Sequence, residues 1–246
     1  MSDGTSPRTV IVTGASSGIG LACARRFLER GDRVVAQYRL HPEPVRRLVA
    51  EFGDRVVPVA ADLGGEAGCV TTVESGGRPD VLVHSAGIWN HAPIAELDLA
   101  RLDEMFRVNT YSAFLLAREA VTMMTSGSMV FVGSTAGQRG EPGNAHYAAS
   151  KAALWGLVQS LAQELAPAVR VNLVSPGWVR TPMTDEALAA GGREARITAA
   201  VPLARIAEPE DVAAAVAFLA DDDQARHLTG VDLSVSGGAL LPMPRG

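Results

Sequence analysis

The 246-residue sequence is poor in cysteine and has no long apolar run. Its two cysteines, Cys23 and Cys69, are too few for a disulfide framework and lack the paired spacing of a zinc site. No segment approaches the roughly 20 consecutive apolar residues of a membrane-spanning helix. The first residues also lack the charged-then-apolar pattern of a signal peptide. These absences predict a cytoplasmic protein that is not embedded in a membrane.

An excess of positive charge is absent as well. Lys and Arg together number 22 and Asp and Glu 27, which gives a net charge of −5. A nucleic-acid partner calls for a basic face that neutralises phosphates, so we expect none. The five histidines contain no pair at the spacing of metal ligands, and we predict no metal site. The hydrophobic content of 47% is that of an ordinary globular protein.

Short apolar runs alternate with helical periodicity along the chain. Strands are expected at residues 9–13, 33–38, 55–60, 80–84, 128–134, 169–174 and 231–235. Helices are expected at residues 18–31, 42–52, 64–77, 147–166, 187–200 and 209–220, and one or two helices are expected within residues 97–125. The strands are apolar on both faces, which is typical of a parallel sheet covered by helices on both sides. We therefore predict an α/β fold with one doubly wound, Rossmann-type domain of seven parallel strands over residues 9–246, after a frayed tail over residues 1–8.

A glycine-rich turn separates the first expected strand from the first expected helix. Gly14, Gly18 and Gly20 allow a tight turn and a close approach of the backbone to a pyrophosphate. The helix that follows offers free N–H groups and the positive end of its dipole. The turn therefore predicts a dinucleotide site. The same residues match the nucleophile elbow of hydrolases around Ser16, but no later histidine carries a supporting motif, so this alternative is weaker.

The end of the second expected strand indicates which dinucleotide is bound. An acid that holds a ribose 2′-hydroxyl usually stands there, but this chain has Tyr38 followed by Arg39. No carboxylate lies between Asp32 and Glu43. Arg39 can pair with a 2′-phosphate through a charge-assisted contact, although a solvated loop arginine is the alternative. We expect a preference for NADP(H) of at least about tenfold, with NAD(H) as the weaker cofactor.

A tyrosine and a lysine stand four residues apart in the expected helix 147–166. This spacing places Tyr147 and Lys151 on one helix face. A nearby cation stabilises a phenolate, so the pair can act as a general acid and base on a carbonyl or an alcohol. By itself the spacing also occurs by chance on solvated helices. Ser134, however, ends the fifth expected strand, at the sheet edge where α/β folds build their sites, and can hydrogen-bond a substrate oxygen.

In this order and context the motifs resemble those of the short-chain dehydrogenases/reductases, over about residues 9–238. The resemblance implies four catalytic residues: Asn109, Ser134, Tyr147 and Lys151. It implies cofactor contacts from Tyr147, Lys151 and Arg39, and from Gly14, Ser16, Ser17, Gly18, Ile19, Gly20, Asp62, Leu63, Ala86, Gly87, Pro176, Gly177, Val179 and Thr181. The chain departs from the family where Asn-Asn-Ala-Gly is common, because it has His84-Ser85-Ala86-Gly87 instead. We interpret His84 as structural.

The resemblance further implies hydride transfer between NADP(H) and a ketone or secondary alcohol. A 3-oxoacyl or polyketide-like ketone, free or carrier-bound, is the favoured substrate. The alternatives are an oxidative dehydrogenase of a small alcohol or sugar, and a cofactor-binding regulator without catalysis. Trp89 and Trp178 fit a pocket wall and an ordinary core equally well. Apolar faces near residues 109–125 and 147–166, used for assembly in the family, predict a homotetramer or, failing that, a homodimer.

Overall fold

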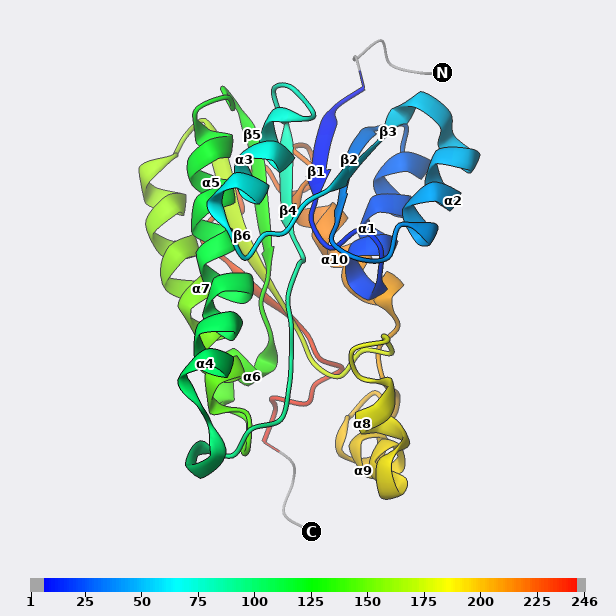
Figure 1. The fold of residues 1–246 in the computed structure, drawn as a ribbon, viewed down its shortest axis with the longest axis vertical. Coiled ribbons are helices and arrows are strands. Elements are labelled where there is room, and N and C mark those ends of the chain that lie inside the picture. Colours follow the sequence, from blue (N-terminus) through cyan, green and yellow to red (C-terminus); the bar gives the residue numbers. More distant parts are fainter. Residues whose placement is uncertain (1–6, 243–246) are drawn as a thin grey trace.

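Seven parallel strands form the centre of the protein, which a computed structural model describes for residues 7–242 (Figure 1). The strands are β1 (Thr9–Val12), β2 (Arg33–Tyr38), β3 (Val56–Ala60), β4 (Val81–His84), β5 (Gly127–Val132), β6 (Val169–Pro176) and β7 (Asp232–Val235). They lie in the order β3-β2-β1-β4-β5-β6-β7. The chain therefore reverses direction across the sheet between β1 and β4, and α/β folds bind ligands at such a switch point.

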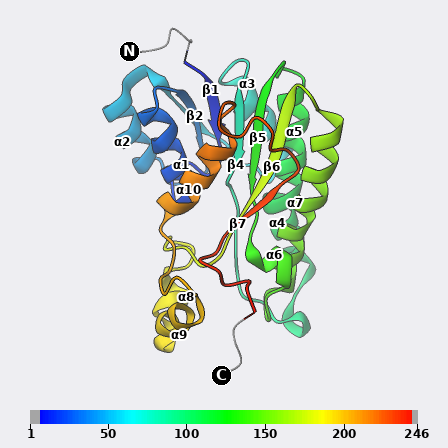
Figure 2. The same cartoon turned by 180° about the vertical axis from the view of Figure 1, so that it is seen from behind.

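Helices cover both faces of the sheet (Figures 1 and 2). Those of five or more residues are α1 (Gly18–Glu29), α2 (Glu43–Phe52), α3 (Glu66–Glu74), α4 (Leu99–Phe106), the π-helical η3 (Arg107–Tyr111), α5 (Ser112–Val121), α6 (Thr135–Arg139), α7 (Ala145–Glu164), α8 (Asp185–Ala189), α9 (Arg193–Ala200) and α10 (Pro209–Leu219). Short 3₁₀ turns are η1 (Gly53–Arg55), η2 (Ile94–Glu96) and η4 (Ala190–Gly192). Helices α1, α2 and α10 pack on one face, and α3, α5 and α7 pack on the other.

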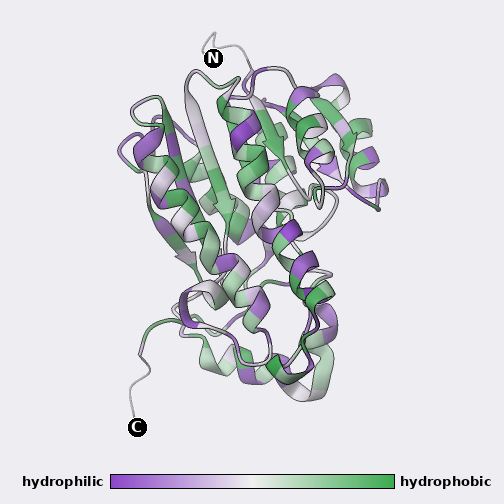
Figure 3. Cartoon of the chain, turned by 60° about the vertical axis from the view of Figure 1, so that its left-hand side comes forward, coloured by the Kyte–Doolittle hydropathy of each residue, from purple (hydrophilic) through white to green (hydrophobic). Residues whose placement is uncertain are grey.

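Alternate residues of the central strands pack into two separate hydrophobic cores, one on each face of the sheet. In β1, Val10 and Val12 pack with α1 and α10, whereas Ile11 packs with α3, α5 and α7. Both faces of each central strand are thereby buried, which explains the unbroken apolar runs. Figure 3 shows hydrophobic residues concentrated in the strands and strongly hydrophilic residues mostly on helices and loops. Pro58 fits this arrangement because β3 lies at the edge of the sheet, where a missing N–H is tolerated.

The predicted doubly wound parallel sheet is confirmed, with every strand close to its expected place. Three local differences matter for the site. Helix α6 was not expected. The segment 97–125, expected to hold one or two helices, contains α4 and α5 with the π-helical η3 between them. The expected helix 187–200 is divided because Gly191 and Gly192 adopt positive φ angles of 52° and 70°. Helices α8 and α9 project beyond the carboxyl edge of the sheet (Figure 2).

Part of the expected N-terminal tail is anchored to the domain. Residues 1–6 lie outside the described residues, but Arg8 is not frayed as predicted. Its Nη2 lies 2.8 Å from Oδ2 of Asp32, and its Nη1 donates to the carbonyl oxygen of Ala220 at 3.0 Å. Cys23 and Cys69 are both free and buried. Within residues 7–242, every helix is too short or too polar to cross a membrane.

Candidate active site

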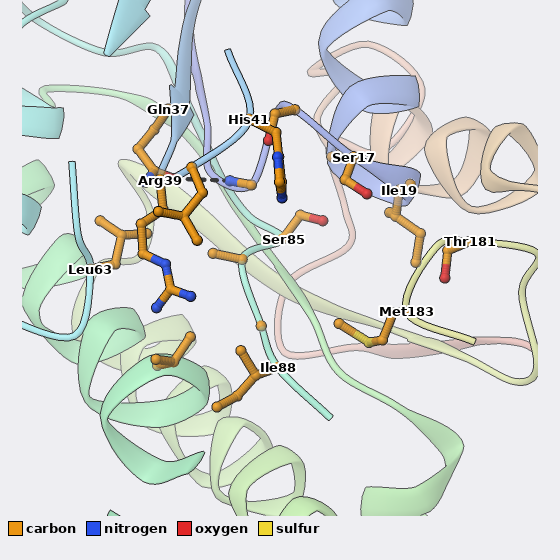
Figure 4. A pocket seen from close by; sticks show the side chains of 18 of the residues that line it. Ser17, Ile19, Gln37, Arg39, His41, Leu63, Ser85, Ile88, Thr181 and Met183 are labelled. Atoms are coloured by element: carbon orange, nitrogen blue, oxygen red, sulfur yellow. Dashed lines mark hydrogen bonds between the residues drawn. The ribbon is translucent and has the colours of Figure 1, made fainter. Parts of the chain in front are cut away.

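The glycine turn between β1 and α1 lines a cavity of about 300 Å³ (Figure 4). Most of the predicted cofactor contacts meet there: Gly14, Ser16, Ser17, Gly18, Ile19, Gly20, Arg39, Asp62, Leu63, Ala86, Gly87 and Thr181. A Cβ atom on Gly20 would lie only 2.2 Å from the carbonyl oxygen of Gly14, so the turn needs glycine at this position. The sequence separation of these residues is large, and the switch point between β1 and β4 brings them together.

The start of α1 has the features of an anion site. Ser17 is the N-cap residue, but its side chain makes no capping hydrogen bond, and no acidic residue stands in the first turn. The first N–H groups of α1 and the positive end of its dipole are therefore available to a phosphate. Together with the glycine-lined approach, this end of the cavity fits the pyrophosphate of a dinucleotide.

Two polar residues that the sequence did not single out hold this turn in place. Buried Gln37 accepts a hydrogen bond from the Gly14 N–H at its Oε1 (2.9 Å) and donates from Nε2 to the Ala61 carbonyl (2.8 Å). Thr13 accepts the N–H groups of Ser85 and Ala86 at its Oγ1, each at 3.0 Å. A signal for Gln37 was present, because a glutamine inside an apolar strand is expected to have buried partners.

Arg39 lies at the opposite end of the cavity from Thr181 and Met183, and its guanidinium group projects inward (Figure 4). The side chain is exposed, so a ligand can reach it without a large rearrangement. Leu40 and His41 also line the cavity, and no pattern in the sequence predicted them. An exposed cation in an otherwise acid-free strand end provides the charge that a 2′-phosphate requires.

A smaller cavity of about 70 Å³ holds the predicted catalytic hydroxyls. Ser134 and Tyr147 both line it, as do Trp89, Glu141 and Trp178. Ser134 does not end β5 as expected but caps α6, where its Oγ accepts the Ala136 N–H at 3.1 Å. The two tryptophan rings meet edge to face with centroids 6.5 Å apart. They are therefore a pocket wall, which settles the question that the sequence left open.

Burial raises the pKa of Tyr147 to about 12. A hydrogen bond with Ser134 lowers this pKa, and the nearby charge of Glu141 raises it. The phenol is therefore protonated at neutral pH, the form in which it can donate a proton. The expected lowering by Lys151 is not among the causes of this shift.

Lys151, the sole lysine of the chain, is buried beside β5. Its Nζ donates a hydrogen bond to the Val132 carbonyl at 2.9 Å, and burial lowers its pKa to about 8. A Cβ atom on Gly87 would lie 3.2 Å from Lys151 Nζ and equally close to Asn109 Oδ1. The absence of a side chain at Gly87 thus leaves both groups next to the larger cavity.

Asn109 is held from three directions. Its Oδ1 accepts the Ile88 N–H at 2.8 Å, and its Nδ2 lies 3.0 Å from both the Ile88 carbonyl oxygen and Ser150 Oγ. The residue lies in η3, and π-helical turns often mark functional sites. Asn109 therefore ties the strand-end loop after β4 to α7, the helix that carries Tyr147.

A few predicted residues lie away from both cavities. Pro176 pairs in register with Val235 of β7, and Val179 is buried, whereas their neighbour Gly177 lines the smaller cavity. His84 is fully buried with its Nε2 2.8 Å from Ser112 Oγ, and burial lowers its pKa to about 3. This environment fits the structural interpretation of His84.

Known proteins resemble the chain along almost its whole length. The family described as Enoyl-(Acyl carrier protein) reductase matches residues 14–239. The 3-oxoacyl-[acyl-carrier-protein] reductase FabG of Rickettsia prowazekii (strain Madrid E) is 36% identical over 238 residues, which cover 95% of this chain and 97% of that protein. The 3-oxoacyl-[acyl-carrier-protein] reductase of Synechocystis sp. is 34% identical over 245 residues, with the same coverage of 95% and 97%.

Solved structures share the fold as well. A putative NAD(P)-dependent gluconate 5-dehydrogenase from Beutenbergia cavernae, with NADP bound at low occupancy, has a TM-score of 0.90 and 39% identity. A short-chain dehydrogenase/reductase from Brucella melitensis, titled glucose/ribitol dehydrogenase, has a TM-score of 0.89 and 35% identity. Each alignment covers 96% of this chain and 97% of the other.

Proposed function

The chain belongs to the short-chain dehydrogenase/reductase family of oxidoreductases, and on this premise we propose that it is an NADP(H)-dependent ketoreductase acting on a 3-oxoacyl thioester or a related ketone. The observation that carries the proposal is the junction of the two cavities. Met183 lines both of them, while Lys151 and Asn109 lie against Gly87 at the edge of the larger one. A ketone beside Tyr147 would thus adjoin the end of a dinucleotide.

Each predicted catalytic residue is assigned one role in the proposed reaction. When bound, the nicotinamide would supply the hydride. Ser134 hydrogen-bonds the substrate carbonyl oxygen, and Tyr147 donates its phenolic proton to that oxygen as the alcohol forms. Lys151 stabilises the resulting phenolate and holds the nicotinamide ribose. Asn109 supports a water through which the proton of Tyr147 is replaced.

The residues that would hold NADP(H) divide along the larger cavity. We assign the pyrophosphate to the start of α1, the 2′-phosphate to Arg39, and adenine to Asp62 and Leu63. The NADP bound by the Beutenbergia cavernae protein supports this choice. NAD(H) lacks the 2′-phosphate and would gain nothing from Arg39, so we expect it to bind more weakly.

The proposed activity can be measured by following the absorbance of the nicotinamide. The purified protein should oxidise NADPH when a 3-oxoacyl thioester is added, presented either as a small thioester or on a carrier protein. A second candidate, an oxidative dehydrogenase of a sugar or small alcohol, is favoured by the names of the solved relatives and by the Glu141 carboxylate, which lines the same cavity as Tyr147. Turnover of polyols with NADP⁺ and none of ketones with NADPH would select this candidate and refute the first.

We further propose that the chain assembles as a homotetramer or, failing that, a homodimer. Three large apolar or aromatic side chains, Tyr111, Phe114 and Trp155, are exposed on η3, α5 and α7. Clusters of this kind on the surface of a folded chain favour contacts with a further copy. Sedimentation at micromolar concentration should give a mass of two or four chains, and a monomer would contradict the proposal.

A further inference from the structure

A third cavity, of about 320 Å³, shares one lining residue with the catalytic cavity. Within residues 7–242, Trp178 is the single residue that lines both. The third cavity lies between β7 and the loop that leads into α10. Trp178 therefore borders both a small catalytic space and a larger space with no role in the proposed reaction.

Both the side chain and the backbone of Trp178 are held in place. Trp89 meets the indole edge to face at 6.5 Å, and the Arg193 guanidinium carbon lies 5.1 Å from its ring centroid. The backbone carbonyl oxygen of Trp178 accepts a hydrogen bond from the Ala207 N–H at 3.1 Å. Removing the ring would thus leave the backbone of this loop anchored through the hydrogen bond to Ala207.

The lining of the third cavity suits an apolar guest. Val201, Leu203, Leu233 and Val235 supply aliphatic surface. The two charged side chains at this cavity, Arg205 and Asp211, pair with each other at 2.6 Å and 2.8 Å. Because these charges neutralise each other, a charged ligand finds no counter-ion, whereas a hydrocarbon gains by leaving water.

We propose that Trp178 sets the chain length of the ketone that the enzyme accepts. The indole ends the catalytic cavity, so the native enzyme acts on ketones with short alkyl chains. The third cavity takes the alkyl chain of a longer ketone once the indole is removed. This inference rests on the proposed reduction of an alkyl-substituted ketone.

The test is a chain-length series from 3-oxobutanoyl to 3-oxododecanoyl thioesters of N-acetylcysteamine with NADPH. In the native enzyme, kcat/KM should stop rising once the alkyl chain fills the catalytic cavity. In Trp178→Ala, it should continue to rise by about fourfold for each added methylene, the fold-change that corresponds to ~0.8 kcal/mol of apolar burial. Equal slopes in the two proteins would overturn the proposal.

Two further variants distinguish an alkyl chain that enters the third cavity from one that only gains room in the catalytic cavity. Trp89 lines the catalytic cavity but not the third one, so Trp89→Ala should shift the chain length at which kcat/KM stops rising but still show such a limit. Leu203 lines the third cavity and is 67% exposed, so a larger residue is tolerated there. Adding Leu203→Trp to Trp178→Ala should refill the cavity and return the slope toward the native value.

Folding and turnover are controlled separately. NADPH binding and the thermal midpoint report whether Trp178→Ala is folded, and Trp178→Leu serves in its place if it is not. A series of 2-alkanones tests chain length if thioesters are not substrates. If no ketone is reduced, the proposed function is refuted, and calorimetric binding of the thioesters decides this inference instead. Affinity must then rise with chain length in the Trp178 variant beyond the native limit, and parallel profiles would overturn the proposal.

Discussion

The two working cavities of this protein are built by different means. The cofactor cavity depends on backbone packing at the β1–α1 turn, where a Cβ atom on Gly20 would meet the Gly14 carbonyl oxygen. The catalytic cavity is formed by side chains from three separate segments, including Trp89, Glu141 and Trp178. A backbone-built site is bound to its fold, whereas a side-chain-built site can change its substrate on the same fold. If the two cavities are independent, a substitution in one cavity should leave the function of the other unchanged.

The largest effect is expected from the catalytic side. Tyr147→Phe removes the acidic proton but keeps the ring, so turnover should fall by about 10²–10⁴-fold, the contribution typical of general acid catalysis. Affinity for NADPH, measured by fluorescence titration, should stay near the native value because the phenol is not part of the cofactor cavity. Near-native turnover would remove Tyr147 from its proposed role.

The second substitution lies in the glycine turn of the cofactor cavity. Gly20→Ala places a Cβ 2.2 Å from the Gly14 carbonyl oxygen, so the turn must shift. We expect a loss of about 1–3 kcal/mol in the free energy of unfolding, as for other overpacked sites, together with a marked loss of NADPH affinity. Gly65→Ala is the matched control, because nothing lies within 4 Å of its added Cβ. Unchanged urea unfolding and NADPH binding in Gly20→Ala would contradict this account.

One side chain is expected to matter within the backbone-built cavity. Arg39→Ala should raise the Michaelis constant for NADPH about tenfold, or ~1.4 kcal/mol, and leave that for NADH nearly unchanged. Arg46→Ala is the control, since Arg46 is also exposed but lies on α2 and pairs with Glu43. If the native enzyme uses both cofactors equally well, or Arg39→Ala leaves the NADPH constant unchanged, Arg39 does not bind the phosphate.

The last change concerns Lys151, which lies against Gly87 at the edge of the cofactor cavity. Burial lowers its folded-state pKa to about 8, below its usual 10.5. Between these values the folded chain binds fewer protons than the unfolded chain, so stability contributed by this site rises with pH. Relative to Lys151→Met, the native free energy of unfolding should rise by at most ~1.4 kcal/mol per pH unit across this window.

Two measurements check this prediction on the protein without cofactor. Urea unfolding of both proteins on either side of the window gives the difference in slope. Because Lys151 is the sole lysine, ¹⁵N-lysine labelling gives one ε-amino signal whose titration reports its pKa directly. Parallel pH profiles together with a titration near 10.5 would show that the amine is not desolvated.

The sequence also held a signal for Lys151 that its spacing to Tyr147 did not use. Of the 22 lysines and arginines in the chain, all except Lys151 are arginines. An arginine at this buried position could not lose its charge, whereas a lysine can shift its pKa when buried. The single lysine of an arginine-rich chain was therefore a separate reason to assign it a function.

Local patterns alone determined the parallel sheet, the glycine turn and the shared helix face of Tyr147 and Lys151, because each depends on residues close together in the chain. Only the tertiary structure decided that Gln37 anchors the turn, that Asn109 contacts Ser150 of α7, and that Trp178 lines two cavities. These contacts join segments far apart in the sequence, so no periodicity encodes them. The same holds for the pKa values of Tyr147 and Lys151, since desolvation depends on what the whole fold packs around a group.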